Sequence, residues 1–83
     1  MTHAEVSMIE MATLRAQEYG PYADLNHLLG VLVEELDEFK DEVRRNDKRA
    51  ARLELIDIVG ACIKGIRQIE ENYHVGCERK SRG

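Results

Sequence analysis

The sequence predicts an all-α fold, an antiparallel bundle of three main helices that is completed by oligomerisation. Hydrophobic residues make up 43% and charged residues 34% of a chain with 6 glycines and 1 proline, a composition typical of helical proteins. Aromatic residues are only 5%, with no tryptophan, which argues against a β-sandwich. At 83 residues the chain is shorter than most domains, so its own core is small and a multimer is expected.

The first helix is expected to run from Thr2 to about Gln17 or Glu18. Thr2 and Glu5 have the spacing of a capping box, in which each side chain satisfies a backbone N–H of the other residue. Residues 19–22 read Tyr-Gly-Pro-Tyr. This segment should end the helix, because glycine adopts positive φ easily and proline cannot continue a helix.

The second helix follows Asp24, a residue suited to cap it. Its apolar residues recur at alternating spacings of four and three, which is typical of a coiled-coil seam. We name these residues the leucine seam: Leu25, Leu29, Leu32, Leu36, Phe39 and Val43. Asn46 can take the left-handed conformation that ends helices, and Asp47 can cap the next one. The short turn predicts that the second and third helices are antiparallel neighbours.

The third helix is expected from about Lys48 to about Asn72 or Tyr73. Its apolar side is too broad for one partner, which again indicates a multimer. That side comprises Leu55, Ile58, Val59, Cys62, Ile63, Ile66 and Ile69. Residues 76–83 carry polar side chains with no apolar anchor and are interpreted as a mobile tail, which leaves residues 1–75 as the helical domain.

The charge balance narrows the choice of partners and location. With 12 basic and 16 acidic residues the net charge is −4, so the chain lacks the broad cationic face that binds duplex nucleic acid. No stretch approaches the roughly 18 apolar residues of a membrane span, and no membrane association is expected. The two cysteines, Cys62 and Cys77, suit free thiols in a reducing compartment, so a cytoplasmic location is expected.

Two acidic pairs are the main candidates for chemistry. Glu35 and Glu38 share one side of the second helix with Glu42, and Glu54 and Asp57 share one side of the third. Four carboxylates brought together in a partly dehydrated site would repel one another unless a cation lay between them. Oxygen ligands without Cys or His are the preference of hard cations, so Mg²⁺ is expected, with Mn²⁺ as an alternative.

A simpler interpretation of these carboxylates stays open. Acidic runs on amphipathic helices are usually solvated faces, as Glu34, Asp37 and Asp41 are expected to be. The second acidic pair favours a metal site, because it lies on the side of the third helix where small residues would allow close approach of another helix. Those small residues are Ala50, Ala61 and Gly65.

Residues 32–39, LVEELDEF, and residues 53–59, LELIDIV, resemble the Glu-x-x-Glu and Glu-x-x-Asp signature of MazG-like all-α nucleoside triphosphate pyrophosphohydrolases. These enzymes are related to dimeric dUTPases and phosphoribosyl-ATP pyrophosphohydrolases, and the resemblance covers about residues 25–70. It implies a Mg²⁺-dependent enzyme that cleaves a nucleoside triphosphate between the α and β phosphates, giving a nucleoside monophosphate and pyrophosphate. It also implies a homodimer or homotetramer.

The same resemblance assigns residues. Glu35, Glu38, Glu54 and Asp57 match the metal-binding positions of the family. We take Glu38 as the catalytic residue, the carboxylate that orients or deprotonates the attacking water.

The substrate contacts are less well marked in the sequence. Lys64 lies two turns after Asp57 and is either a cation for phosphate or a solvated lysine; Tyr19 and Tyr22 are either base-stacking residues or packing anchors. Longer family members carry phosphate-binding residues on a fourth helix. This chain has no clear counterpart of them beyond Asn72, Arg79, Lys80 and Arg82.

Two other interpretations were weighed. Glu71-x-x-His74 has the spacing of a di-iron carboxylate motif, but the chain holds a single copy, so coincidence is the preferred explanation. His27 is either a ligand contact or a partly buried polar residue. The alternative function, from a different class, is a non-catalytic helical oligomerisation or regulatory module that presents an acidic face.

Overall fold

The computed structural model describes residues 1–76 and, within them, side chains up to Glu71. This part of the chain contains no strand, and the all-α prediction is confirmed. Its helices are α1 (His3–Gln17), α2 (Leu25–Arg44) and α3 (Lys48–Gly76). Helix α3 therefore continues a few residues past the expected end at Asn72 or Tyr73. The tail predicted for residues 76–83 lies, beyond Gly76, outside the described residues.

All three helices have the N-terminal side-chain cap that the sequence predicts. The Thr2 hydroxyl accepts a hydrogen bond from the Glu5 N–H at 3.1 Å, and the Glu5 carboxylate accepts one from the Thr2 N–H at 2.9 Å. Asp24 accepts from the N–H of His27 at 2.8 Å. These caps satisfy N–H groups that the first turn of a helix leaves without a partner.

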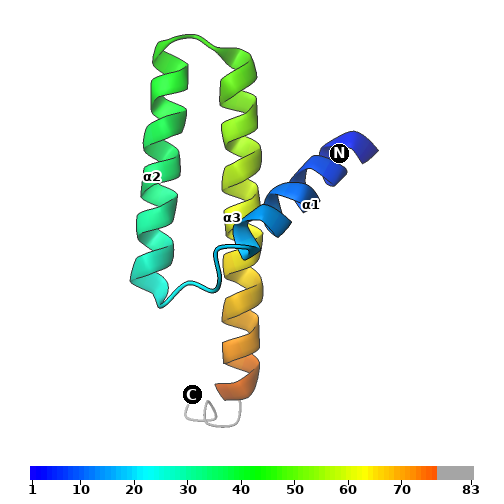
Figure 1. The fold of residues 1–83 in the computed structure, drawn as a ribbon, viewed down its shortest axis with the longest axis vertical. Coiled ribbons are helices and arrows are strands. Elements are labelled where there is room, and N and C mark those ends of the chain that lie inside the picture. The colour runs from blue at the N-terminus through cyan, green and yellow to red at the C-terminus, as the bar shows by residue number, and fades with distance from the viewer. Residues whose placement is uncertain (77–83) are drawn as a thin grey trace.

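The two turns also follow from local chemistry. Gly20 has φ 81° and Asn46 has φ 57°, so each residue leaves the preceding helix through the left-handed region. Asp47 then accepts a hydrogen bond from the Ala50 N–H at 3.0 Å and starts α3. The second turn is short, and α2 and α3 run side by side in opposite directions as predicted (Figure 1).

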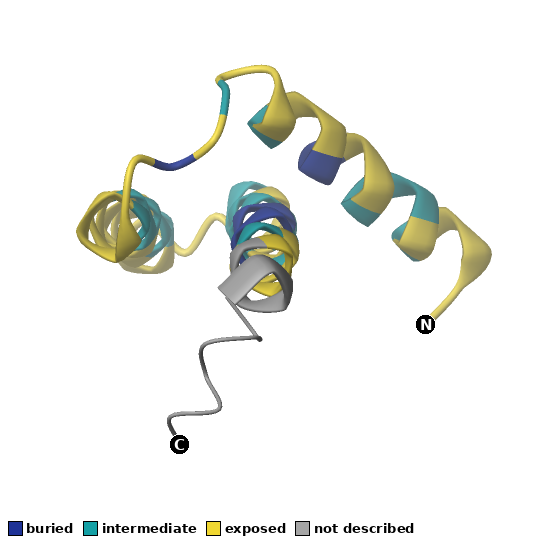
Figure 2. Ribbon diagram, turned by 90° about the horizontal axis from the view of Figure 1, so that it is seen from below, coloured by how far each residue is buried: buried dark blue, intermediate teal, exposed yellow. Residues whose placement is uncertain are grey.

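Helix α3 is the central element. It packs against both α1 and α2, which have little contact with each other. Helix α1 crosses α3 obliquely near the middle of α3 instead of lying along it (Figure 1), and in the view along α3 the two partners of that helix lie on different sides (Figure 2). No helix within the described residues is long and apolar enough to cross a membrane.

Helices α1 and α3 meet through small residues. A Cβ atom added to Gly60 would lie 2.8 Å from the Cβ of Ala12 and 2.9 Å from its backbone carbon, so only glycine fits at this crossing. Thr13 and Ala61 are also buried there. The buried surface of α1 and that of α3 face each other in Figure 2. Close backbone approach therefore holds α1 on α3.

Most of the leucine seam lies away from α3 in the single chain. Four seam residues, Leu25, Leu29, Leu36 and Val43, are exposed, and only Leu32 and Phe39 are half-buried. The other half-buried residues of α2 are Leu28, Val31, Glu35 and Glu42. Thus Glu35 takes a place on the inner side of the α2–α3 pair that an apolar residue would usually occupy.

The core of the single chain is accordingly small. Among the described residues, the buried apolar side chains are Ala12, Tyr22 and Ala61, and no large side chain is fully buried. All the apolar residues of α3 that the sequence analysis singled out are half-buried or exposed, including Ile66 and Ile69.

Candidate metal centre

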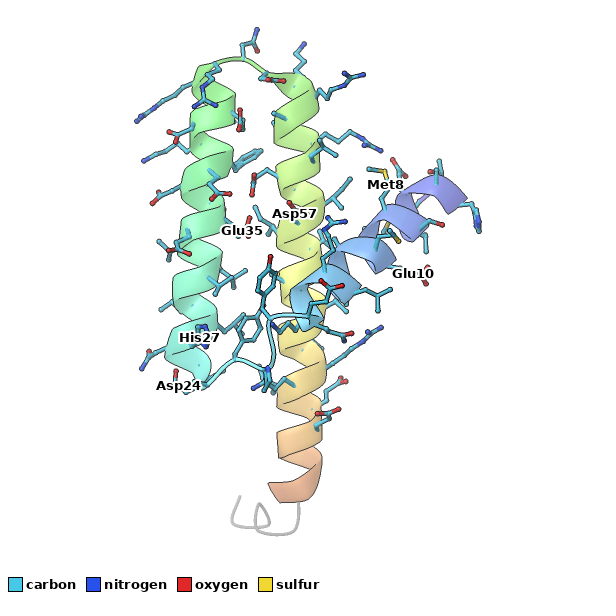
Figure 3. All side chains as sticks on the ribbon, in the orientation of Figure 1. Met8, Glu10, Asp24, His27, Glu35 and Asp57 are labelled. Atoms are coloured by element: carbon cyan, nitrogen blue, oxygen red, sulfur yellow. The ribbon has the colours of Figure 1, made fainter. Side chains whose placement is uncertain are left out.

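Three acidic side chains converge between α2 and α3. Glu35, Glu38 and Glu54 each offer one carboxylate oxygen, and these three oxygens lie within 4.8 Å of one another. Glu35 and Glu38 are one turn apart on α2, and the antiparallel α3 places Glu54 opposite them. Figure 3 shows Glu35 extending from α2 toward α3. The structure therefore brings together three of the four carboxylates that the sequence analysis grouped.

Two oxygens of this cluster have an unusual environment. Glu35 Oε1 and Glu54 Oε2 are shielded from solvent, and neither has a hydrogen-bond partner among the described residues. A buried carboxylate oxygen without a donor or a cation is unfavourable, because it loses hydration and gains nothing in return. A hard divalent cation fits this donor set, since it accepts only oxygen ligands here and would replace the lost hydration.

Proximity within the cluster favours the protonated form of Glu54. The pKa of Glu54 is raised to about 7, first because its protonated form can donate a hydrogen bond to Glu35 and second because the group is partly buried. The pKa of Glu38 is also raised, chiefly because its protonated form can donate to Glu54. At neutral pH Glu54 is thus partly protonated, which offsets some of the repulsion between the carboxylates.

Asp57 lies beside the cluster but has a different partner. Its Oδ1 forms an ion pair with Nη2 of Arg15 on α1 at 2.9 Å, and both side chains are partly exposed. Asp57 lies on α3 close to where α1 crosses (Figure 3). Its charge still contributes to the raised pKa of Glu54, so the fourth carboxylate remains within electrostatic reach of the other three.

A pocket of about 320 Å³ opens next to the cluster, bounded by all three helices and the loop between α1 and α2. Glu35 and Asp57 contribute carboxylates to its wall, and Arg15 and Lys64 contribute cations. The remaining lining residues are Ala12, Ala16, Tyr19, Gly20, Tyr22, His27, Val31 and Ala61. The pocket thus combines both signs of charge with an aromatic border.

Lys64 is fixed in the wall of this pocket. It is only 7% exposed, its Nζ donates a hydrogen bond to the backbone oxygen of Ala16 at 2.7 Å, and the same nitrogen lies 4.1 Å from the ring centroid of Tyr22. Burial lowers its pKa. Of the two roles that the sequence left open, the solvated lysine does not fit this environment.

The two candidate tyrosines lie in different environments. Tyr22 is buried, its hydroxyl donates to the Ala61 carbonyl at 3.3 Å, and Gln68 binds its backbone N–H and carbonyl at 2.8 and 2.6 Å. Tyr22 therefore anchors the loop to α3. Tyr19 is 89% exposed at the pocket border, where its ring is free to meet a ligand.

His27 takes part in the same loop structure. Its Nδ1 accepts a hydrogen bond from the Ala23 N–H at 2.9 Å, and its ring meets that of Tyr22 edge to face. It also lines the pocket.

Sequence reasoning missed Arg15 and Gly60. Arg15 lies between Ala12 and Ala16, and two small residues spaced a turn apart are a signal that this face of α1 approaches another helix. The side chains of Asn72, His74, Arg79, Lys80 and Arg82, considered above for phosphate or iron binding, lie outside the described residues.

Comparison of the chain with protein-family models, curated proteins and solved structures finds no match. The geometry of the cluster and the pocket therefore carries the functional interpretation.

Proposed function

We propose that this protein is a Mg²⁺-dependent nucleoside triphosphate pyrophosphohydrolase that cleaves between the α and β phosphates, in keeping with the family that its acidic motifs resemble. The observation that carries the proposal is the convergence of Glu35, Glu38 and Glu54, two of them with buried oxygens that have no partner among the described residues, at the edge of a pocket that also holds cations.

The charges of the site favour a divalent ion. Glu35, Glu38, Glu54 and Asp57, when ionised, face the two cations Arg15 and Lys64. Two negative charges remain, which one Mg²⁺ or Mn²⁺ would neutralise. When bound, the metal supplies charge for the triphosphate and a water molecule of lowered pKa.

The exposure of each carboxylate suggests its role in the proposed reaction. Glu35 and Glu54 hold the ion through their shielded oxygens, and Asp57 supports it from the edge. Glu38, the exposed member of the cluster, is suited to orient the attacking water and to accept its proton. Lys64 faces the phosphates from the pocket wall, and Tyr19 offers its ring to the base. The ring face of Tyr22 lies against the Lys64 ammonium group.

The active form is proposed to be a homodimer or homotetramer acting in the cytoplasm on free nucleotides and not on duplex nucleic acid. The exposed leucine seam and the exposed isoleucines of α3 are apolar surfaces that a second chain would cover.

An alternative is a non-catalytic helical oligomerisation or regulatory module. The observation that favours it is the very small core of the single chain, because such a chain needs a partner to cover its apolar side chains. Under this alternative, the acidic cluster binds a structural metal or a basic partner and catalyses no reaction.

The decisive experiment is a nucleotide panel incubated with Mg²⁺ and scored separately for pyrophosphate and orthophosphate. We expect pyrophosphate, and we expect Glu38→Gln to lower kcat by about 100-fold or more. Asp37→Asn, on the exposed side of the same helix, is the matched control and should keep its activity. Release of orthophosphate alone, or no turnover by the unmutated oligomer, would contradict the proposal.

A further inference from the structure

The ion pair between Arg15 and Asp57 joins two groups that could each bind a ligand instead: Arg15 an anion in the pocket, and Asp57 a metal ion in the cluster. Asp57 is the one family-matching carboxylate that is held outside the cluster, and the residue holding it comes from α1. Both groups line the pocket that also contains Lys64. An anion entering this pocket would meet both cations, and a metal entering the cluster would lie next to Asp57.

The surroundings of Lys64 suit it to contact an anion. One of its three N–H donors binds the Ala16 carbonyl, and the face of Tyr22 lies beside it. No carboxylate partner of this ammonium group is found among the described residues. A buried ammonium with spare donors toward a pocket favours a negatively charged ligand there.

Arg15 differs from Lys64 in being movable. Its side chain is 57% exposed, and one Nη2 contact with Asp57 uses a small part of a guanidinium that carries five N–H donors. An exposed ion pair of this kind contributes little to stability, so exchanging its partners costs little. The fork of donors also suits the oxygens of a phosphate group.

We propose that Arg15 and Lys64 form the phosphate subsite of the pocket. In the free protein Arg15 is paired with Asp57, and binding of a metal ion and a phosphate chain breaks this ion pair. Asp57 then turns to the metal, and Arg15 turns to the phosphates. This inference rests on the proposed function for its ligand, the phosphate chain of a nucleoside triphosphate. It assigns to α1 a role that the family gives to residues of a fourth helix.

The test uses inorganic pyrophosphate and Mg²⁺ as separate probes in isothermal titration calorimetry of the full chain. With Mg²⁺ present, Arg15→Gln and Lys64→Gln should each weaken pyrophosphate binding about tenfold or more. The matched control is Arg52→Gln, since Arg52 of α3 also contacts α1, at Met8 Sδ, but does not line the pocket. It should bind pyrophosphate like the unmutated chain.

The proposed release of Asp57 from Arg15 can be tested separately through the affinity for Mg²⁺. Arg15→Gln should tighten the binding of Mg²⁺ alone several-fold, because Asp57 is then free for the metal. In an Asp57→Asn background the same change should have little effect, which a double-mutant cycle measures. A purely structural ion pair would instead leave the affinity for Mg²⁺ unchanged in Arg15→Gln and would change only the melting temperature, and only in the background that keeps Asp57.

Unchanged pyrophosphate affinity in Arg15→Gln, equal tightening in the Asp57→Asn background, or no pyrophosphate binding by the unmutated chain would overturn the inference. The proposed function is tested separately by hydrolysis. If the affinities change as described but no nucleotide is cleaved, the subsite stands and the enzymatic proposal is wrong. If nucleotides are cleaved and Arg15→Gln binds pyrophosphate normally, the enzyme stands and the subsite is wrong.

Discussion

Helix α3 makes two contacts of different character. Where α1 crosses it, Gly60 and Ala12 bring the two backbones together and no charged group is buried between those two residues. Where α2 lies along it, the inner side carries Glu35 opposite Glu54, with buried oxygens that lack partners among the described residues. The α1–α3 crossing is packed tightly at Gly60 and pairs its charged groups, Arg15 with Asp57 and Lys64 with the Ala16 carbonyl, whereas the α2–α3 pair holds carboxylate oxygens that have no partner among the described residues. Local instability of this kind is typical of a ligand site.

The largest expected effect is on stability, and the same substitution, glycine to alanine, should affect the two contacts of α3 differently. Gly60→Ala should cost about 2 to 3 kcal/mol, because the added Cβ meets the backbone of Ala12, which cannot move away. Gly65→Ala should change stability by less than about 1 kcal/mol, because its Cβ meets the flexible end of Leu28 and alanine favours the helix. Chemical denaturation measures both.

Gly30→Ala is the control for helix propensity, since a Cβ there meets nothing within 4 Å. It should stabilise the protein by about 0.5 to 1 kcal/mol. Equal costs at Gly60 and Gly65 would remove the contrast between a rigid crossing and an adaptable helix pair.

Metal should act first on the carboxylates between α2 and α3. At saturating concentration, Mg²⁺ should stabilise the protein by about 2 to 3 kcal/mol, because it binds the folded cluster and not the unfolded chain. A chelator should reverse the effect, and Glu35→Gln should abolish it while leaving the effect of Gly60→Ala unchanged. A melting temperature that Mg²⁺ does not move in the unmutated protein would contradict a metal site.

A smaller effect is expected from pH in the absence of metal. Glu54 has a pKa of about 7 when folded, against an ordinary value of 4.5, so the folded state binds its proton more readily than the unfolded chain. Its contribution to stability is therefore complete below about pH 4.5 and is lost as the pH rises through about 7. Glu54→Gln should flatten the fall in melting temperature between about pH 6 and about pH 8. A fall of equal size in that variant would assign the pH dependence to other groups.

The smallest effect on the single chain is expected on the outer face of α2. Leu36 is exposed, so Leu36→Lys should change the folding of one chain by no more than about 0.5 kcal/mol. We expect it nevertheless to abolish assembly, as measured by analytical ultracentrifugation, because it places a charge in the leucine seam. Asp41→Lys, on an exposed side away from the seam, controls for the added charge. Unchanged assembly in Leu36→Lys would place the interface elsewhere.

The positions of the helices were predictable because their signals are local. Thr2 with Glu5, Asp24, Gly20, Asn46 and Asp47 act within one turn of their own position, and each behaves as its residue type predicts. The convergence of Glu35, Glu38 and Glu54 was also predictable, since it needs only helical spacing and a short turn between antiparallel helices.

Other features depended on contacts between residues far apart in the sequence. The spacing of the leucine seam does not indicate which side of α2 faces α3: Leu28 lies against Gly65, whereas Leu29 and Leu36 of the seam are exposed. No local signal indicated that Arg15 would pair with Asp57, or that the Lys64 ammonium group would lie on the face of the Tyr22 ring.

The amino-acid sequence alone thus determined the helices, their order and the acidic character of the α2–α3 pair. The tertiary structure alone decided how α1 crosses α3, and through that crossing which cations reach the pocket. The physical reason is that caps, turns and helical periodicity depend on neighbours along the chain. The direction from which one helix approaches another depends instead on where two surfaces can come closest, here at Gly60 and Ala12.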